Sequence, residues 1–306
     1  MPSPHRAGAA RVLREPTLPR CQSNGIEIEY DTFGAPDDPA ILLIMGQGMQ
    51  LTGWEPGLCT RLADYGFHVI RFDNRDVGLS THLDDAPVPD LFAVLSGDTE
   101  GVPYLLADMA DDAAGLLTAL GIEAAHVVGV SMGGMIAQEL LLRCPERVLT
   151  ACSIMSTTGA AGVGRPDDSV AAALISPPAR TRDEAVERGV SLWRLLQSPA
   201  YPRSEEVLRE RAAAFYDRCS DPAGSLRQLV AVLASPDRTP GLRAVQVPTL
   251  VLHGEADPLI GVSGGHATAA AVPGAVLRTF PGMGHDLPPE LWDEYVAEII
   301  ANTKRA

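Results

Sequence analysis

Short apolar runs alternate along this chain with longer segments in which apolar residues recur every three or four positions. The short runs have the length of strands and are hydrophobic on both faces, which is typical of strands inside a parallel sheet. The longer segments have the period of amphipathic helices. The alternation therefore predicts an α/β protein with a mostly parallel sheet flanked by helices. The expected strands are 40–45, 67–72, 125–130, 148–155, 247–252 and 276–279, and the expected helices are 54–65, 108–120, 132–143, 262–271 and 291–301.

Two segments depart from this alternation. Residues 26–33 alternate between apolar and polar side chains, so we expect an antiparallel strand at an edge of the sheet. Residues 157–240 contain no convincing strand, and glycine and proline separate helical segments there, of which 181–197 and 204–218 are the clearest. Because the strand–helix alternation resumes after residue 240, we interpret 157–240 as a helical cap or lid inserted between two halves of one sheet.

The resulting domain organisation is a core of residues 21–156 and 241–306 with the cap between its halves. A second autonomous domain is the alternative, but the insertion has few large apolar residues from which to build a core of its own. Residues 1–20 carry four arginines and no apolar stretch of signal-peptide length. We therefore expect a flexible N-terminal extension and a cytoplasmic protein.

The composition narrows the choice of partners. The formal net charge is −15 over 306 residues, whereas nucleic-acid binding needs clustered lysine and arginine, so nucleic acid is not an expected partner. The same charge disfavours highly anionic substrates unless a local pocket overrides the average field. No apolar run reaches the roughly 18 residues that a membrane helix needs, so no membrane contact is expected. The five cysteines include no C-x-x-C pair, which argues against a disulfide framework and a zinc site. The sequence leaves the oligomeric state open.

The strongest chemical signal is G-V-S-M-G at 129–133, which follows an expected buried strand and precedes an expected helix. A serine nucleophile needs a turn so tight that only small neighbours fit, because the strained turn lifts its hydroxyl clear of the sheet. The start of the next helix then directs free N–H groups at the forming oxyanion. Ser131 is therefore the candidate nucleophile, with a structural Gly-rich turn as the alternative.

A serine hydroxyl needs a base, and the base needs an orienting acid, in the chain order Ser, acid, His. Three of the seven histidines lie beyond the insertion. His285 stands in the loop F-P-G-M-G-H, where backbone freedom lets its ring reach the site, whereas His253 ends a strand and His266 falls in a helical pattern. We therefore take His285 as the base.

The candidate acid is Asp257, which follows the strand T-L-V-L-H-G at the carboxyl edge of the sheet. Glu255 and Asp286 are its rivals, and we interpret each of them as a solvated loop charge. The loop at 156–159 is the other place where an acid could stand, and it has no carboxylate.

A second donor to the oxyanion is expected from the loop Gly46-Gln47-Gly48-Met49, whose glycines let backbone N–H groups face the substrate. We assign the N–H of Gln47 together with that of Met132. A flexible strand-to-helix turn is the alternative for this loop.

The remaining conspicuous residues have structural interpretations. Asp73 and Asp76 have no third metal ligand nearby in the sequence, so a salt-bridged loop is expected, and the acids at 108–112 are interpreted as helix-start residues favoured by the helix dipole. Five aromatic residues are candidates for lining an acyl or ring pocket, although core packing suits each of them at least as well: Trp54, Trp193, Tyr201, Phe215 and Tyr216.

Four motifs together resemble the α/β-hydrolase superfamily from about residue 25 to the C-terminus: H-V-V-G-V-S-M-G-G-M-I-A-Q, F-D-N-R-D-V-G-L-S, V-P-T-L-V-L-H-G-E-A-D and P-G-M-G-H-D-L-P. Within it, M-G-Q-G followed by T-G-W, with R-D where R-G is commoner, resembles the aclacinomycin methylesterase-like bacterial esterases. The likeness implies an eight-stranded α/β-hydrolase fold and hydrolysis of a small-molecule carboxylic ester without cofactor or metal. It also implies a triad of Ser131, Asp257 and His285, and an oxyanion hole of Gln47 and Met132.

The predicted function is therefore that of a serine hydrolase acting through an acyl-enzyme. A C–C bond hydrolase, a lactonase or a cofactor-free perhydrolase would use the same triad, and these alternatives stay open. A non-catalytic small-ligand receptor is the alternative outside enzymes, although such receptors tend to lose a triad member.

Overall fold

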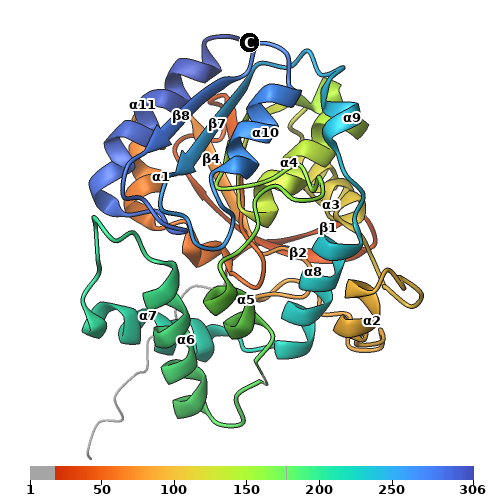
Figure 1. Cartoon of the computed structure of the whole chain (residues 1–306). Helices are drawn as coiled ribbons and strands as arrows, with labels where there is room; N and C mark the ends of the chain where they lie inside the picture. Colours follow the sequence, from red (N-terminus) through yellow and green to blue (C-terminus); the bar gives the residue numbers. More distant parts are fainter. Residues whose placement is uncertain (1–17, 177) are drawn as a thin grey trace, which may run out of the picture.

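The computed structural model describes residues 18–176 and 178–306. Its centre is an eight-stranded sheet with the order β1-β2-β4-β3-β5-β6-β7-β8 (Figure 1). The strands are β1 (Arg20–Ser23), β2 (Ile26–Phe33), β3 (Ala40–Ile44), β4 (His68–Phe72), β5 (Ala125–Val130), β6 (Val148–Ile154), β7 (Thr249–Gly254) and β8 (Val276–Phe280). β2 pairs antiparallel with both β1 and β4, and every other pairing is parallel. The predicted fold class is confirmed.

Helices cover both faces of the sheet. They are α1 (Pro56–Ala63), α2 (Leu91–Leu95), α3 (Leu106–Ala119), α4 (Met132–Arg143), α5 (Asp168–Leu174), α6 (Arg182–Leu196), α7 (Glu205–Arg218), α8 (Pro222–Ala234), α9 (Thr239–Leu242), α10 (Ser263–Ala271) and α11 (Trp292–Thr303), with short 3-10 turns at Leu51–Gly53, Pro145–Arg147 and Pro289–Leu291. α1 and α11 pack against one face, and α3 and α4 pack against the other. A hydrophobic cluster lies on each face of the sheet. Leu42 belongs to the cluster beneath α3 and α4, and its neighbour Leu43 belongs to the cluster beneath α1 and α11. That alternation explains why β3 is apolar throughout.

The N-terminal edge of the sheet differs from the prediction. The segment Ile26–Phe33 is antiparallel as expected, but it lies between β1 and β4, and β1 is the edge strand. Arg20, which the sequence interpretation gave to the flexible extension, is the first residue of β1 and pairs with Glu29. With only four residues, R-C-Q-S, β1 is too short and polar to show a strand pattern. Residues 1–17 of the predicted extension lie outside the described residues.

Helices α5 to α9 occupy the chain between β6 and β7, and Figure 1 shows α5, α6 and α7 grouped at the end of the molecule toward which β7 and β8 run. The sequence pattern found α6 and α7 but missed α8. The signals for α8 were present, because Asp221 caps its N-terminus by accepting from the Gly224 N–H and Pro222 takes the first helical position. Among the described residues, no helix has the length and apolar character needed to cross a membrane.

Buried ion pairs fix the loops at the carboxyl edge. Asp76 receives two hydrogen bonds from Arg227 of α8, at 2.8 and 2.7 Å, which agrees with the expected salt-bridged loop. Asp112 was expected to be a helix-start residue, but it lies in the middle of α3 and is buried. Its carboxylate accepts two hydrogen bonds from the guanidinium of Arg75, each of 2.6 Å. Breaking a buried pair leaves an uncompensated charge, so these contacts hold the loop after β4 firmly in place.

Candidate active site

Ser131 stands on the tight turn between β5 and α4. Its φ of 56° and ψ of −120° lie outside the regions that L-residues ordinarily adopt, and its N–H donates to the Ile154 carbonyl at 2.8 Å. The turn requires its two glycines: a Cβ on Gly129 would lie 2.0 Å from the Gly133 carbonyl oxygen, and one on Gly133 would lie 2.1 Å from that of Ile44. The strained turn thus presents the serine side chain at the carboxyl edge of the sheet.

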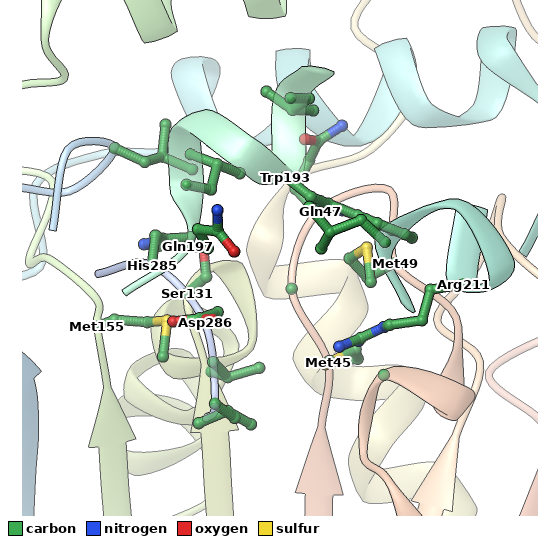
Figure 2. A pocket seen from close by; sticks show the side chains of 18 of the residues that line it. Met45, Gln47, Met49, Ser131, Met155, Trp193, Gln197, Arg211, His285 and Asp286 are labelled. Atoms are coloured by element: carbon green, nitrogen blue, oxygen red, sulfur yellow. The ribbon is translucent and has the colours of Figure 1, made fainter. Parts of the chain in front are cut away.

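The structure brings Ser131, His285 and Asp257 together although the three lie on separate loops (Figure 2 shows the first two). The Oγ of Ser131 is 3.0 Å from Nε2 of His285. The other ring nitrogen, Nδ1, is 2.7 Å from Oδ2 of Asp257. These are hydrogen-bond distances, so the hydroxyl, the imidazole and the carboxylate form one continuous chain.

The carboxylate of Asp257 is held in a single orientation. Its Oδ1 accepts from the backbone N–H groups of Leu259 and Ile260, at 2.9 Å each, which leaves Oδ2 facing His285. His253, the alternative base, lies behind this acid, with Nε2 at 2.7 Å from the Ile260 carbonyl. Burial lowers the pKa of His253, which favours the neutral form of its ring. His266 lies exposed on α10.

The two expected oxyanion donors belong to segments that meet at Ser131. Met132 is the first residue of α4, where a backbone N–H has no acceptor within the helix. The loop of Gln47 lies directly against the serine, since a Cβ on Gly46 would come within 3.2 Å of the Ser131 Cβ. Both segments therefore border the place where an oxyanion would form on attack by Ser131.

Helix α8 holds the loop of Gln47 and Gly48 in place through hydrogen bonds. The sequence analysis did not anticipate this contact. Ser225 accepts from the Gln47 side-chain amide through its carbonyl, at 2.7 Å, and through its Oγ, at 2.9 Å. The Gln228 Oε1 accepts from the Gly48 N–H at 2.7 Å, and its Nε2 donates to the Arg75 carbonyl at 2.6 Å. No sequence signal marked Ser225 or Gln228, because their role depends on a contact between residues far apart in the chain.

We expect Gln228→Ala to lower kcat by about tenfold with a smaller effect on KM, because a loosened loop weakens a donor that acts mainly on the transition state. The measurement is steady-state ester hydrolysis by purified variants. The matched control is Gln246→Ala, which removes an exposed glutamine whose side-chain amide donates to the nearby Ala244 carbonyl. An equal loss in both variants, or a change confined to KM, would contradict the positioning role.

Beside Ser131 the structure contains a cavity of about 170 Å³. Its walls come from the loop after β3, from the loops of Ser131 and His285, and from helices α5, α6 and α7, and Figure 2 shows Trp193 of α6 and Arg211 of α7 beside it. Among the five aromatic candidates, Trp193 lines this cavity, with Phe215 packed edge-on behind it at a centroid distance of 6.4 Å. Trp54 is buried in the core. The cavity is otherwise mostly apolar, with methionine and leucine side chains at Met45, Met49, Met155, Leu174, Leu192, Leu196, Leu208, Leu259 and Leu287.

The two rival acids have different surroundings. Glu255 is exposed and accepts from the Thr279 hydroxyl, as expected for a solvated loop charge. Asp286 contradicts that interpretation, because it lines the cavity and its Oδ1 accepts from the Ser198 N–H at 3.0 Å and from the Ser198 hydroxyl. Burial raises the pKa of Asp286, and the hydrogen bonds from Ser198 oppose that shift.

One group of potential metal ligands occurs among the described residues, since ligand atoms of Asp76, His82 and Asp221 lie within 4.8 Å of one another. The sequence had suggested no third ligand near Asp76, and the fold supplies two. Their lone pairs are largely committed, because both oxygens of Asp76 accept from Arg227 and Oδ2 of Asp221 lies 2.6 Å from Nδ1 of His82. The adjacent guanidinium also repels a cation, so the arrangement fits an ion-pair network better than a metal centre.

Comparisons with known proteins agree with the observed fold. The model of the Alpha/beta hydrolase family matches residues 46–298. The rhodomycin D methylesterase DauP of Streptomyces sp. (strain C5) is 30% identical over 299 residues, which cover 90% of this chain and 94% of that protein. The rhodomycin D methylesterase DnrP of Streptomyces peucetius is 30% identical over 298 residues, with the same coverage. The crystal structure of a hydrolase from Pseudomonas aeruginosa PA01 superposes with a TM-score of 0.73 at 26% identity, covering 94% of this chain and 99% of that one.

Proposed function

Because the chain belongs to the α/β-hydrolase family, we propose that it is a serine esterase that hydrolyses a carboxylic ester through Ser131, His285 and Asp257. The observation that carries this proposal is the chain of hydrogen bonds from Ser131 Oγ through His285 to Asp257, beside a cavity that can receive a substrate. The names of the two methylesterase relatives support an ester as the bond cleaved.

In the first half-reaction Ser131 Oγ attacks the ester carbonyl while Nε2 of His285 takes the hydroxyl proton. The carbonyl oxygen becomes an oxyanion, and we assign its stabilisation to the backbone N–H groups of Gln47 and Met132. The tetrahedral intermediate then collapses, the C–O bond to the alcohol breaks, and the leaving oxygen receives the proton from Nε2. The product at this stage is an acyl-enzyme on Ser131.

In the second half-reaction a water molecule transfers a proton to Nε2 of His285 and attacks the acyl carbon. Collapse of the second tetrahedral intermediate returns the proton to Ser131 Oγ and releases the carboxylic acid. Asp257 keeps the Nδ1 proton of His285 in place and stabilises the imidazolium without becoming protonated. These steps use only side chains, backbone N–H groups and water.

We further propose that residues 157–240 act as a cap that sets substrate selectivity. Helices α6 and α7 contribute Leu192, Trp193, Leu208 and Arg211 to the lining of the cavity. These two helices pack against each other through a small hydrophobic cluster of Val186, Val190, Leu208 and Ala212. Substitutions there should change which ester is accepted while leaving the acyl-transfer apparatus intact.

The test is hydrolysis of p-nitrophenyl esters from acetate to dodecanoate, followed before steady state. We expect a burst of about one nitrophenolate per active site, because an acyl-enzyme accumulates when deacylation is the slower step. A dry cavity of roughly 150 Å³ holds one benzene molecule, so a cavity of about 170 Å³ predicts the fastest turnover for acyl chains of about four to six carbons. A folded sample that neither turns over these esters nor reacts with a fluorophosphonate would contradict the proposal.

A further inference from the structure

One wall of the substrate cavity is charged, and the esterase mechanism does not use it. Arg203, from the loop between α6 and α7, and Arg211, from α7, both line the cavity together with Glu55 of the core. Both arginines bind the same carboxylate oxygen, Glu55 Oε1, at 2.7 Å from Arg203 Nη2 and 3.1 Å from Arg211 Nη1. Two guanidinium groups thus share a single carboxylate partner.

Most of the hydrogen-bond donors of these arginines are uncommitted. A guanidinium has five N–H donors in a fixed planar fork, and among the described residues the side chains of Arg203 and Arg211 each donate only to Glu55. Nε of Arg203 is buried and has no acceptor in the described part of the chain. A buried donor without an acceptor costs free energy that a bound acceptor would recover.

The surroundings favour an anion at this place. Arg211 lies over the Trp193 ring, with its Cζ 5.3 Å from the ring centroid, which fixes the guanidinium at the cavity wall. Burial lowers the pKa of Arg211, and the carboxylates of Glu55 and Asp286 oppose this shift only in part, so a further negative charge at the guanidinium would stabilise the cation. Asp286 acts on both arginines through its charge, but it makes no direct ion pair with either of them among the described residues, and its Oδ1 accepts from Ser198.

We propose that Arg203 and Arg211 form a carboxylate subsite, so that the preferred substrate is an ester whose acyl part also carries a free carboxylate. The planar fork of a guanidinium matches a carboxylate better than it matches a neutral ester or an alkyl chain. Figure 2 shows the guanidinium of Arg211 near Met45, on the other side of the view from Ser131 and His285, and all four residues line the same cavity. The net charge of −15 does not by itself prevent this binding, because the two guanidinium groups at the cavity wall offset the carboxylates of Glu55 and Asp286 beside them.

The alternative role of the ion pairs between Glu55 and the two arginines is structural, since Glu55 precedes α1 of the core and both arginines belong to the cap. Ion pairs that only fasten the cap to the core would not distinguish one substrate from another. The two roles therefore differ in what happens to the ratio between a charged and a neutral substrate when one arginine is removed.

The subsite rests on the proposed esterase function, and the experiment compares the monomethyl with the dimethyl esters of straight-chain diacids from succinate to suberate. We expect the monomethyl ester of the best-fitting diacid to have a kcat/KM at least about tenfold above that of its dimethyl ester, since hydrogen bonds to charged groups are worth about ten- to a hundredfold. Arg203→Gln and Arg211→Gln should each bring this ratio close to one.

The matched control is Arg209→Gln, on the same helix as Arg211 but exposed and paired with Glu187 and Glu205 at the surface. It should keep the wild-type ratio. A ratio near one in the wild type, or a ratio that survives in both cavity variants, would overturn the subsite while Ser131-dependent turnover continued.

A binding measurement separates failure of the subsite from failure of the esterase function. Calorimetric titration of Ser131→Ala with the same monomethyl ester should show binding at least about tenfold tighter than that of the dimethyl ester, and a second substitution at Arg211 should abolish the difference. Equal affinities would overturn the subsite. Selective binding by a protein that hydrolyses neither ester would uphold it and refute the esterase proposal instead.

Discussion

Ser131→Ala is expected to reduce kcat for ester hydrolysis by a factor of about 10⁴ to 10⁶, as loss of the nucleophile does in other serine hydrolases. Alanine retains the backbone and the Cβ but removes the oxygen that lies 3.0 Å from Nε2 of His285. Water would then have to attack the ester without a covalent intermediate, so the pre-steady-state burst should also vanish. A variant that keeps more than about a tenth of wild-type kcat would contradict the assignment of Ser131 as nucleophile.

A second substitution at the same position separates loss of activity from loss of fold. Ser131 has a φ of 56°, and residues other than glycine are strained in that part of backbone space by about 1–3 kcal/mol. Ser131→Gly should therefore be at least as stable as Ser131→Ala in thermal unfolding, and equally inactive. A glycine variant markedly less stable than the alanine variant would show that the turn does not store this strain.

Much of the candidate site was predictable because its signals are local. The tight turn around Ser131 needs glycine at 129 and 133 for steric reasons that operate within a few residues, and such needs leave a motif in the sequence. Asp257 and His285 were chosen by other arguments: Asp257 follows a strand at the carboxyl edge of the sheet, and the Gly/Pro-rich loop of His285 lets its ring reach the site. The structure places these three side chains in hydrogen-bond contact, and the matches to the α/β-hydrolase family confirm the resemblance that the motifs indicated.

The surroundings of the site were not predictable because they depend on how distant segments pack. Asp286 follows His285 in the chain and was expected to be a solvated charge, but the loop of Ser198 covers it. Gln228 lies on a helix that the sequence pattern missed, and it holds the Gly48 backbone from 180 positions away. No motif in the sequence distinguishes Arg203 and Arg211 from the other arginines of residues 157–240. Only the folded chain directs these two into the cavity.

The difference between the predictable residues around Ser131 and their unpredictable surroundings has a physical basis. The proposed chemical step needs a geometry that few residues can provide, so it constrains the sequence closely around Ser131, Asp257 and His285. Substrate selection needs only a cavity of suitable size and charge, which many combinations of cap residues can form. The sequence therefore predicts the class of reaction. Which acyl and alcohol parts of an ester are preferred depends on contacts between distant residues, such as those between Glu55 and the two cavity arginines.

Asp257→Asn should lower kcat by about 10⁴-fold, as the same exchange does in another Ser-His-Asp enzyme. The backbone fixes the direction of the new amide. Oδ1 already accepts from the N–H groups of Leu259 and Ile260, so the asparagine oxygen should keep that place. The amide nitrogen must then face Nδ1 of His285, where it donates a hydrogen bond that the aspartate accepted. The ring proton is thereby moved to Nε2, and the histidine can no longer accept the proton of Ser131.

Glu255→Gln supplies the matched control for this prediction, because it is the same acid-to-amide exchange two residues earlier in the same loop. Glu255 is exposed and contacts the Thr279 hydroxyl rather than the histidine, so kcat should stay within about twofold, as for an ordinary surface substitution. Both variants should bind substrate with similar affinity, which titration in a Ser131→Ala background can measure. If Glu255→Gln lost activity and Asp257→Asn did not, the orienting acid would have to be reassigned. Equal losses in both would point to a disturbed loop rather than to a reversed tautomer.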